Sequence, residues 1–417
     1  MERRHRIEAE QLVAGRGAPL RDACVILDGG AVAYAGPRDG APATGPDTAV
    51  HRVHTVLPGL WDCHVHLTGL RTASLDDAMR VPVPVGAARS VIDAQVALRA
   101  GFTSVREVGG YGVHVARVIE EGTAPGPTVY AAGDLISPTG GHADLHTYSL
   151  GCVSDFADHG GWLRTCDGEA ECLRAVRLQL RRNAKLVKIC ASGGVMTEYD
   201  DPMHQQFTDH ELRTIVEEAA RAERVVAAHC HGKVGIMAAL RAGARTIEHG
   251  TYLDAEAADV MKEVGAVLVT TRLVTERMLA FGQANGMPEY SWNKLVTMGE
   301  RHREAVALAI RSGVTIAAGT DSITTGEHTA LAWGRHGREL ELLVEAGMTP
   351  LAAIEAATAN GPLTVGPQAR KVGQLQVGWD ADVIGVIADP LADVGVLADP
   401  AKITHVWRRG RLEKSPR

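Results

Sequence analysis

The fold of this chain is decided by the stretch Val56-Leu57-Pro58-Gly59-Leu60-Trp61-Asp62-Cys63-His64-Val65-His66-Leu67. It is an apolar run rich in residues that favour β-strands, and it ends in His-x-His. Because successive residues of a strand point to opposite faces, the side chains of His64 and His66 point to the same side. The two imidazoles can therefore bind one metal ion, although the pair alone is equally compatible with a strand end that binds nothing.

The composition is that of an ordinary globular protein. The chain has 417 residues, of which 45% are hydrophobic and 22% are charged, enough for one large domain and a smaller one. A net charge of -7 without a basic stripe argues against a nucleic-acid partner. The sequence contains no run of about 18 apolar residues, the length that would predict a membrane-spanning helix. Because the basic N-terminus leads into Ile7-Glu8-Ala9-Glu10 and not into an apolar signal core, we expect a cytoplasmic protein.

Seven further apolar segments follow the first, and helical stretches separate most of them. They cover residues 103–108, 127–132, 186–190, 224–229, 245–249, 266–271 and 314–319. Eight strands that alternate with helices predict an α/β protein with a (β/α)8 TIM barrel. A doubly wound open sheet is the competing topology, but no glycine-rich phosphate loop follows the first strand.

Both chain ends are rich in short strands and turns. We expect residues 1–56 and 364–417 to pair as a small β-sandwich beside a barrel formed by residues 57–363. The seven cysteines are scattered and include no Cys-x-x-Cys, so neither a disulfide framework nor a zinc ribbon is expected.

Four later strands carry side chains that can join the His-x-His pair in binding metal. They are Lys188, His229, His249 and Asp321. The C-terminal ends of barrel strands meet at one mouth, where imidazoles and a carboxylate are good ligands for zinc-like ions. A buried lysine near a dication loses its proton, and it can then react with carbon dioxide to form a carbamate that bridges two metals. A structural ion pair is the alternative role for Lys188.

This ligand set resembles that of the metal-dependent amidohydrolase superfamily. Local phrases are similar to the branch that holds Xaa-Pro dipeptidases, metallo-carboxypeptidases acting on Xaa-Arg or Xaa-Lys, and imidazolonepropionase-like hydrolases. These phrases are Pro-Gly-Leu-Trp-Asp-Cys-His-Val-His at 58–66, Gly-Phe-Thr-Ser-Val-Arg-Glu at 101–107, Thr-Gly-Gly-His at 139–142 and Ile-Glu-His-Gly-Thr-Tyr at 247–252. The similarity spans nearly the whole chain.

The resemblance implies two divalent ions, expected to be zinc. His64, His66 and Asp321 would bind the more buried ion, His229 and His249 the second, and carboxylated Lys188 would bridge them. A hydroxide shared by the metals would attack the amide carbonyl, and Asp321 would carry the proton to the leaving nitrogen.

The same resemblance suggests roles for residues around the mouth. Tyr252 would donate a hydrogen bond to the developing oxyanion, and His142 would contact the substrate. A packing tyrosine and a histidine that stabilises its own turn are the alternatives. His231 faces the same side as His229, because the two are separated by one residue.

Three further residues are candidates for substrate binding. Arg272 and, with less support, Arg106 can bind a carboxylate through two parallel hydrogen bonds, although an ion pair is the alternative for Arg106. Tyr199 lies in a long loop, residues 192–210, that is expected to set specificity. Cys190 shares a strand face with Lys188 and makes a thiol hydrolase a minor alternative without a supporting motif.

The sequence therefore leads to three hypotheses of function. The first is a dinuclear amidohydrolase that cleaves a dipeptide or an N-acyl amino acid, of the Xaa-Pro dipeptidase or carboxypeptidase type. The second is a hydrolase of a non-peptide amide, such as a cyclic amide, an arylurea or carbamate, a mycotoxin-like amide or a secondary metabolite. Arg272 favours the second, because it departs from the Pro-Thr-Leu type of phrase expected after the seventh strand. The third is a non-catalytic binding protein on the same barrel. The partner expected is a small amide or peptide, and the family habit implies a homo-oligomer.

Overall fold

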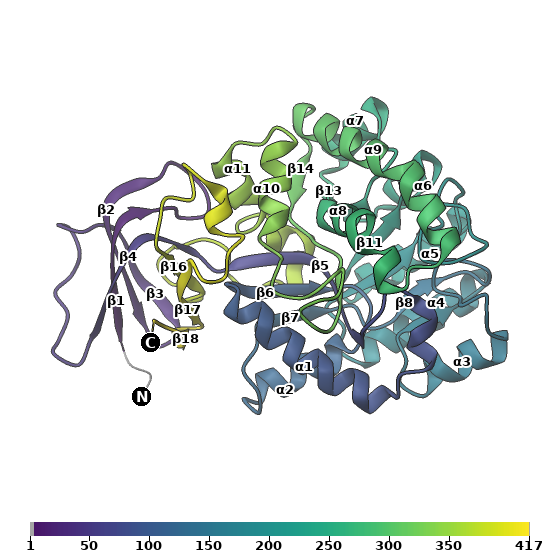
Figure 1. Ribbon diagram of the computed structural model, residues 1–417, viewed down its shortest axis with the longest axis horizontal. Coiled ribbons are helices and arrows are strands. Elements are labelled where there is room, and N and C mark those ends of the chain that lie inside the picture. Colours follow the sequence, from purple (N-terminus) through teal and green to yellow (C-terminus); the bar gives the residue numbers. More distant parts are fainter. Residues whose placement is uncertain (1–3, 417) are drawn as a thin grey trace.

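The computed structural model describes residues 4–416, which form a barrel and a separate β-sheet (Figure 1). Strands from both chain ends make this sheet in the order β18-β17-β16-β4-β1-β2-β3. The bounds are β1 (His5–Leu12), β2 (Leu20–Asp28), β3 (Ala31–Pro37), β4 (Ala49–Pro58), β16 (Val383–Val386), β17 (Ile403–Arg408) and β18 (Arg411–Lys414). The predicted β domain built from both ends is confirmed, and its strands are hydrogen-bonded as one mixed seven-stranded sheet.

The pairing of β4 joins the two ends of the chain. β4 runs parallel to β1 and antiparallel to β16, so the N-terminal and C-terminal strands share one hydrogen-bonded ladder. Alternate residues of β1 are buried, as expected for a strand with one face on a core. That core includes Ile7, Val25, Val383 and Trp407.

Eight parallel strands form the barrel, and they coincide with the eight predicted segments. They are β5 (Leu60–Leu70), β6 (Phe102–Glu107), β7 (Thr128–Ala131), β10 (Leu186–Cys190), β11 (Val225–Cys230), β12 (Thr246–His249), β13 (Val267–Val269) and β14 (Thr315–Ala317). The (β/α)8 barrel is therefore confirmed. Three short strands were not predicted, namely β8 (Leu135–Ser137), β9 (Leu163–Thr165) and β15 (Ser322–Thr324).

The helices follow the strands and pack on the outside of the barrel (Figure 1). They are α1 (Val83–Arg99), α2 (Gly112–Glu120), α3 (Leu150–Asp158), α4 (Gly168–Arg181), α5 (Asp209–Arg221), α6 (Lys233–Ala242), α7 (Ala255–Val264), α8 (Arg272–Phe281), α9 (Glu289–Arg311), α10 (Arg338–Glu345) and α11 (Pro350–Ala356). A capping box formed by Thr208 and Glu211 is present at the start of α5. Between residues 4 and 416 no helix combines the length and the apolar character needed to cross a membrane.

The last N-terminal strand of the sheet passes almost directly into the first strand of the barrel. Only Gly59 separates β4 from β5, and a Cβ atom there would lie 2.1 Å from Oγ1 of Thr103. The amide of Gly59 donates to the carbonyl of Asp382 in the sheet, while the amide of Leu60 donates to Gly101 in the barrel. The two parts are thus joined without a flexible linker.

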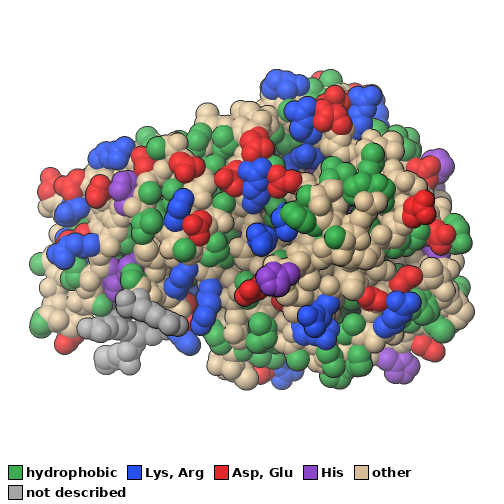
Figure 2. All heavy atoms as spheres, in the orientation of Figure 1, with side chains coloured by type: hydrophobic (Ala, Val, Ile, Leu, Met, Phe, Trp, Pro, Cys, Tyr) green, Lys and Arg blue, Asp and Glu red, His purple; other side chains and the backbone are tan. Residues whose placement is uncertain are grey.

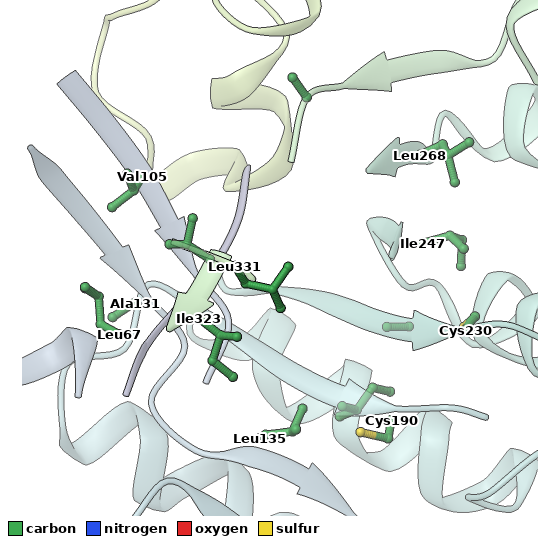
Figure 3. Packing of buried hydrophobic residues seen from close by; sticks show 14 of the residues in the cluster. Leu67, Val105, Ala131, Leu135, Cys190, Cys230, Ile247, Leu268, Ile323 and Leu331 are labelled. Atoms are coloured by element: carbon green, nitrogen blue, oxygen red, sulfur yellow. The ribbon is translucent and has the colours of Figure 1, made fainter. Parts of the chain in front are cut away.

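The aliphatic side chains of Leu67, Val105, Ile247 and Leu268 (Figure 3) alternate along their strands with inward-facing residues, so they pack between the barrel and the surrounding helices. β5 is buried along its whole length, as expected for a central parallel strand. On the outer face shown in Figure 2, acidic and basic side chains are interspersed. The buried strands give a rigid base for the side chains at their C-terminal ends.

Candidate metal centre

The first group of candidate ligands joins β5 to the residue that follows β14. His64 and His66 are both buried, and their Nε2 atoms lie 3.6 Å and 3.3 Å from Oδ1 of Asp321. The ligand atoms of the three residues all lie within 4.8 Å of one another. The structure therefore brings together the residues predicted to bind the more buried ion.

The tautomers of both histidines are set by their second nitrogen atoms. Nδ1 of His64 lies 2.7 Å from Oε2 of Glu248, and Nδ1 of His66 lies 2.7 Å from the carbonyl oxygen of Gly109. A carboxylate and a carbonyl only accept hydrogen bonds, so each Nδ1 carries the proton. Both Nε2 lone pairs are then free for metal, as is usual for histidine ligands.

The second group consists of His229, His231 and His249 at the ends of β11 and β12. Their ligand atoms also lie within 4.8 Å of one another. Nε2 of His229 lies 3.2 Å from the carbonyl oxygen of Gly193, which leaves its Nδ1 free to bind metal. Nδ1 of His249 lies 2.7 Å from Oγ1 of Thr271, which leaves Nε2 free. His231 therefore lies within this group, on the side that the strand period predicted.

Lys188 lines the same cavity as both groups and is 1% exposed. Among the described residues, its Nζ has no hydrogen-bond partner. A buried ammonium without a partner is costly, and burial lowers the pKa of this amine below its usual value. A neutral amine is the form that reacts with carbon dioxide. The residues present therefore fit two divalent ions with a bridging carbamate. Among the described residues, none forms an ion pair with Nζ of Lys188.

Three residues at the C-terminal ends of barrel strands adopt left-handed backbone conformations. The φ angles are 68° for His249, 49° for Thr271 and 60° for Asp321. Such conformations are uncommon for residues other than glycine, and they tend to be found at functional sites. They turn the chain sharply at the mouth, where two of the three residues are candidate ligands.

A buried ion pair lies behind the histidines. Nη2 of Arg106 donates to Oε2 of Glu248 at 2.6 Å, and both side chains are fully buried. Although burial alone would raise the pKa of Glu248, Arg106 and the hydrogen bond from His64 lower it below its usual range. Of the two roles considered for Arg106, the structure places it in the ion pair. Sequence reasoning missed Glu248, although an acidic residue in an otherwise apolar strand was a usable signal.

The two groups of ligands form the floor of a cavity. Its walls are mainly apolar, with side chains that include Leu135, Trp162, Val274, Met278, Met287 and Leu295. No arginine is among the described residues that line it. The cavity is therefore suited to a bulky apolar molecule that reaches the metal ligands with one polar end.

His142 lies in the cavity wall and contacts the second group of ligands. Its ring stacks on that of His229 with centroids 4.5 Å apart. Its Nδ1 lies 2.7 Å from Oγ1 of Thr197 and 3.4 Å from Oδ2 of Asp200. These contacts fix the orientation of the imidazole, so that Nδ1 is occupied by the protein itself.

A lysine from α9 fixes the loop that carries these partners of His142. Nζ of Lys294 lies 2.7 Å from the carbonyl oxygen of Thr197, 3.1 Å from that of Gly194 and 3.3 Å from Oδ1 of Asp200. Although burial would raise the pKa of Asp200, its contacts with His142 lower it below its usual range. Sequence reasoning missed Lys294, because nothing along the chain links it to this loop.

Two predicted substrate-binding residues and the predicted donor to the oxyanion lie outside the residues that line the cavity. Arg272 is buried at the start of α8, and its Nη1 lies 3.5 Å from the carbonyl oxygen of Gly299. Tyr199 is 75% exposed and stacks on His146. Tyr252 is half-buried, and its amide donates to the carbonyl of His231. The roles proposed for these three side chains remain predictions.

Cys190 is fully buried, and burial raises the pKa of its thiol well above the usual value. It is not among the residues that line the cavity. A thiolate is the reactive form of cysteine, so this environment gives a thiol hydrolase no support.

Residues 55–412 match the model of the Amidohydrolase family, and the chain belongs to that family. It is 43% identical to ochratoxinase of Aspergillus niger over 426 aligned positions, which cover 98% of this chain and 86% of the relative. The crystal structure of that ochratoxinase matches with a TM-score of 0.92 and 42% identity, covering 99% of this chain and 96% of the other.

More distant relatives carry other activities. A prolidase complexed with N-methylphosphonate-L-proline matches with a TM-score of 0.91 at 31% identity, covering 99% of this chain and 100% of the other. Imidazolonepropionase of Nocardia farcinica is 27% identical over 422 positions, covering 94% of this chain and 92% of the relative. Together with the ligand groups, these matches define a metal-dependent amidohydrolase that acts on C–N bonds.

Proposed function

We propose that this enzyme hydrolyses an amide with a bulky apolar part, of the mycotoxin type, and is not primarily a dipeptidase. The observation that carries the proposal is the apolar cavity over the metal ligands, whose walls suit a bulky apolar group better than the small side chains of most dipeptides. The full-length similarity to ochratoxinase, at 43% identity, supports the same choice.

The ligand residues are assigned as the sequence suggested. His64, His66 and Asp321 would hold one divalent ion, His229 and His249 would hold the other, and Lys188 as a carbamate would be a ligand to both. Two such ions, expected to be zinc, supply Lewis acidity and lower the pKa of a coordinated water. The unpartnered, buried Nζ of Lys188 supports the carbamate.

The proton is moved by Asp321. Its Oδ1 lies toward both imidazoles of the first group, and the other oxygen is assigned to proton transfer. An amide nitrogen is a poor leaving group unless it is protonated, so the carboxylate takes the proton of the attacking water and gives it to that nitrogen.

The acyl group is positioned by the cavity wall. Nδ1 of His142 is held by Thr197 and Asp200, so its Nε2 is available to the substrate. Tyr252 is retained as the donor to the developing oxyanion. The apolar wall excludes water from the rest of the substrate, which strengthens the hydrogen bonds at the reacting carbonyl.

The proposal is tested by comparing substrates on one metal-loaded preparation. We expect kcat/KM for ochratoxin to exceed that for Xaa-Pro, N-acyl-arginine and N-acyl-lysine substrates by about 100-fold or more, because several apolar contacts are lost with small substrates. Asp321→Asn is the control for hydrolysis at this site. A higher kcat/KM for Xaa-Pro dipeptides would restore the dipeptidase hypothesis, and inactivity on every amide would favour a binding protein.

A further inference from the structure

A threonine and a histidine form a hydrogen-bonded pair in the cavity wall, on the side of α8 and α9. Oγ1 of Thr275 lies 2.9 Å from Nδ1 of His302, and Nε2 of His302 lies 2.7 Å from the carbonyl oxygen of Thr270. Both side chains line the cavity and are nearly buried, with exposures of 6% and 3%. Neither residue belongs to the metal-binding groups.

The chemistry of the groups involved determines which of them donates in each of these two hydrogen bonds. A carbonyl oxygen only accepts, so Nε2 of His302 carries the proton and donates to Thr270. Both nitrogens of this buried ring have uncharged partners, a hydroxyl and a carbonyl, which favours the neutral form. In the neutral ring Nδ1 is an acceptor, and the hydroxyl of Thr275 must donate to it. The single hydrogen of Thr275 is therefore committed to the protein.

The oxygen of Thr275 is then left with lone pairs and no hydrogen for a ligand. The same cavity is lined by the apolar side chains of Val274, Met278, Met287 and Leu295. Among the described residues that line the cavity, Thr275 has the only hydroxyl group. A ligand that places a hydrogen-bond acceptor against this oxygen brings two sets of lone pairs together and forms no hydrogen bond. A ligand with an O–H or N–H group at the same place donates a hydrogen bond to Thr275 in apolar surroundings.

The position of the pair is fixed by a carboxylate from a third helix. Glu339 on α10 accepts from the amides of Arg272 and Leu273 at 2.9 Å and 2.7 Å, and from the hydroxyl of Thr270 at 2.6 Å. These bonds hold the first turn of α8 and the residue whose carbonyl orients His302. The acceptor is thus built into a rigid part of the wall.

We propose that Oγ1 of Thr275 is a specificity determinant that selects substrates with a hydrogen-bond donor on their bulky apolar part. The substrate class is an amide whose aromatic or aliphatic bulk carries a hydroxyl or an N–H group at the depth of Thr275. The proposal rests on the proposed hydrolysis of bulky amides. It specifies that one contact with the substrate is a hydrogen bond that Thr275 accepts.

The probes for the test are N-benzoyl-L-phenylalanine, its three ring-hydroxylated isomers and the three corresponding methoxy compounds. Their dissociation constants are measured by calorimetry on metal-loaded Asp321→Asn protein, so that no turnover is needed. We expect at least one hydroxy isomer to bind about 5- to 20-fold more tightly than both the parent and its methoxy partner. Equal affinities, or no measurable binding of any probe, would overturn the proposal.

Substitutions separate the hydrogen bond from a structural effect. Thr275→Val should abolish the advantage of the hydroxy isomer over the parent compound, while Thr275→Ser should retain it. His302→Phe frees the hydroxyl of Thr275 to donate, so the preference should shift from the hydroxy toward the methoxy compound. Thr297→Val, on the exposed side of α9, is the matched control. An advantage that survives Thr275→Val would refute the role of this oxygen.

The same probes are offered to the wild-type enzyme for hydrolysis. If the wild type cleaves none of them while the binding preference is present, the proposed function fails and the Thr275 contact stands. If the wild type cleaves all of them without regard to the hydroxyl, and the affinities are equal, the contact fails and the proposed function stands.

Discussion

His64 on β5 is oriented by Glu248 on β12, with Nδ1 and Oε2 2.7 Å apart. Glu248 directly precedes His249, a ligand residue of the second group. One strand therefore supplies both a candidate ligand for one ion and the carboxylate that orients a ligand for the other. The two metal positions are thus linked through the backbone of β12.

Glu248→Gln tests this link. The amide cannot match the negative charge between His64 and Arg106, so the tautomer and position of His64 are less well fixed. We expect metal affinity or kcat/KM to fall by about 10- to 100-fold, as for other carboxylates that orient metal-binding histidines. Metal content after dialysis against a chelator and kcat/KM are measured together. Glu121→Gln, at an exposed ion pair, is the control and should change neither.

Lys188 should be carboxylated when the metals are bound. In protein prepared with ¹³C-labelled bicarbonate and zinc, we expect a carbamate signal by ¹³C nuclear magnetic resonance and about two metals per chain. Lys188→Ala should lose the signal and most of the second metal. An unchanged metal content in Lys188→Ala would show that the bridge is not needed.

Lys294→Met should loosen the loop that holds His142. The substitution removes the donor to the carbonyls of Thr197 and Gly194 but keeps a side chain of similar length. We expect KM to rise by about 5- to 10-fold at unchanged metal content, together with faster proteolytic cleavage within residues 193–206. Lys294→Arg should restore part of the effect, and Lys262→Met on the surface of α7 should have none. A fall in kcat alone would contradict a positioning role.

Asp93 should make stability depend on pH. Burial raises the pKa of this carboxyl to about 7, opposed by the hydrogen bond from Thr325 and by Arg89. An unfolded aspartate ionises near pH 4, so between about pH 4 and 7 the folded protein holds a proton that the unfolded chain releases. This group therefore destabilises the wild type increasingly as the pH rises through that range. Relative to wild type, Asp93→Asn should gain about 1–3 kcal/mol in the free energy of unfolding between pH 5 and pH 8.

The measurement is urea unfolding of metal-saturated protein at the two pH values. Asp259→Asn, at an exposed position on α7, is the control. A difference between Asp93→Asn and the wild type that is the same at both pH values would assign the effect to packing.

The barrel and its ligand residues could be predicted because each signal is local. A buried parallel strand is a short apolar run, and a polar residue such as Lys188 within it, or His229 at its end, stands out. The strand periodicity also predicted that His231 lies beside His229. Strands β8, β9 and β15 were not predicted, since three residues each are too few to show a period.

The walls of the cavity could not be predicted, because they depend on contacts between residues far apart in the chain. Glu339 holds the start of α8 from 67 positions away, and Lys294 reaches Thr197 from 97 positions away. The left-handed conformation of Thr271 directs the chain into α8, where Arg272 packs toward α9. The sequence shows that position 272 is an arginine, but it does not show where the guanidinium group of Arg272 points.

The direct passage from β4 through Gly59 into β5 has a consequence for protein engineering. A shortened protein that kept only the barrel would lose β4 together with the strands that pair with it, and it would free the base of the strand that carries His64 and His66. The terminal sheet thus holds β5, the strand that carries His64 and His66, in place. We therefore expect that a protein without this sheet would not be an active, smaller enzyme. Miniaturisation or domain fusion is better directed at β3 and β18, the two outer edges of the terminal sheet.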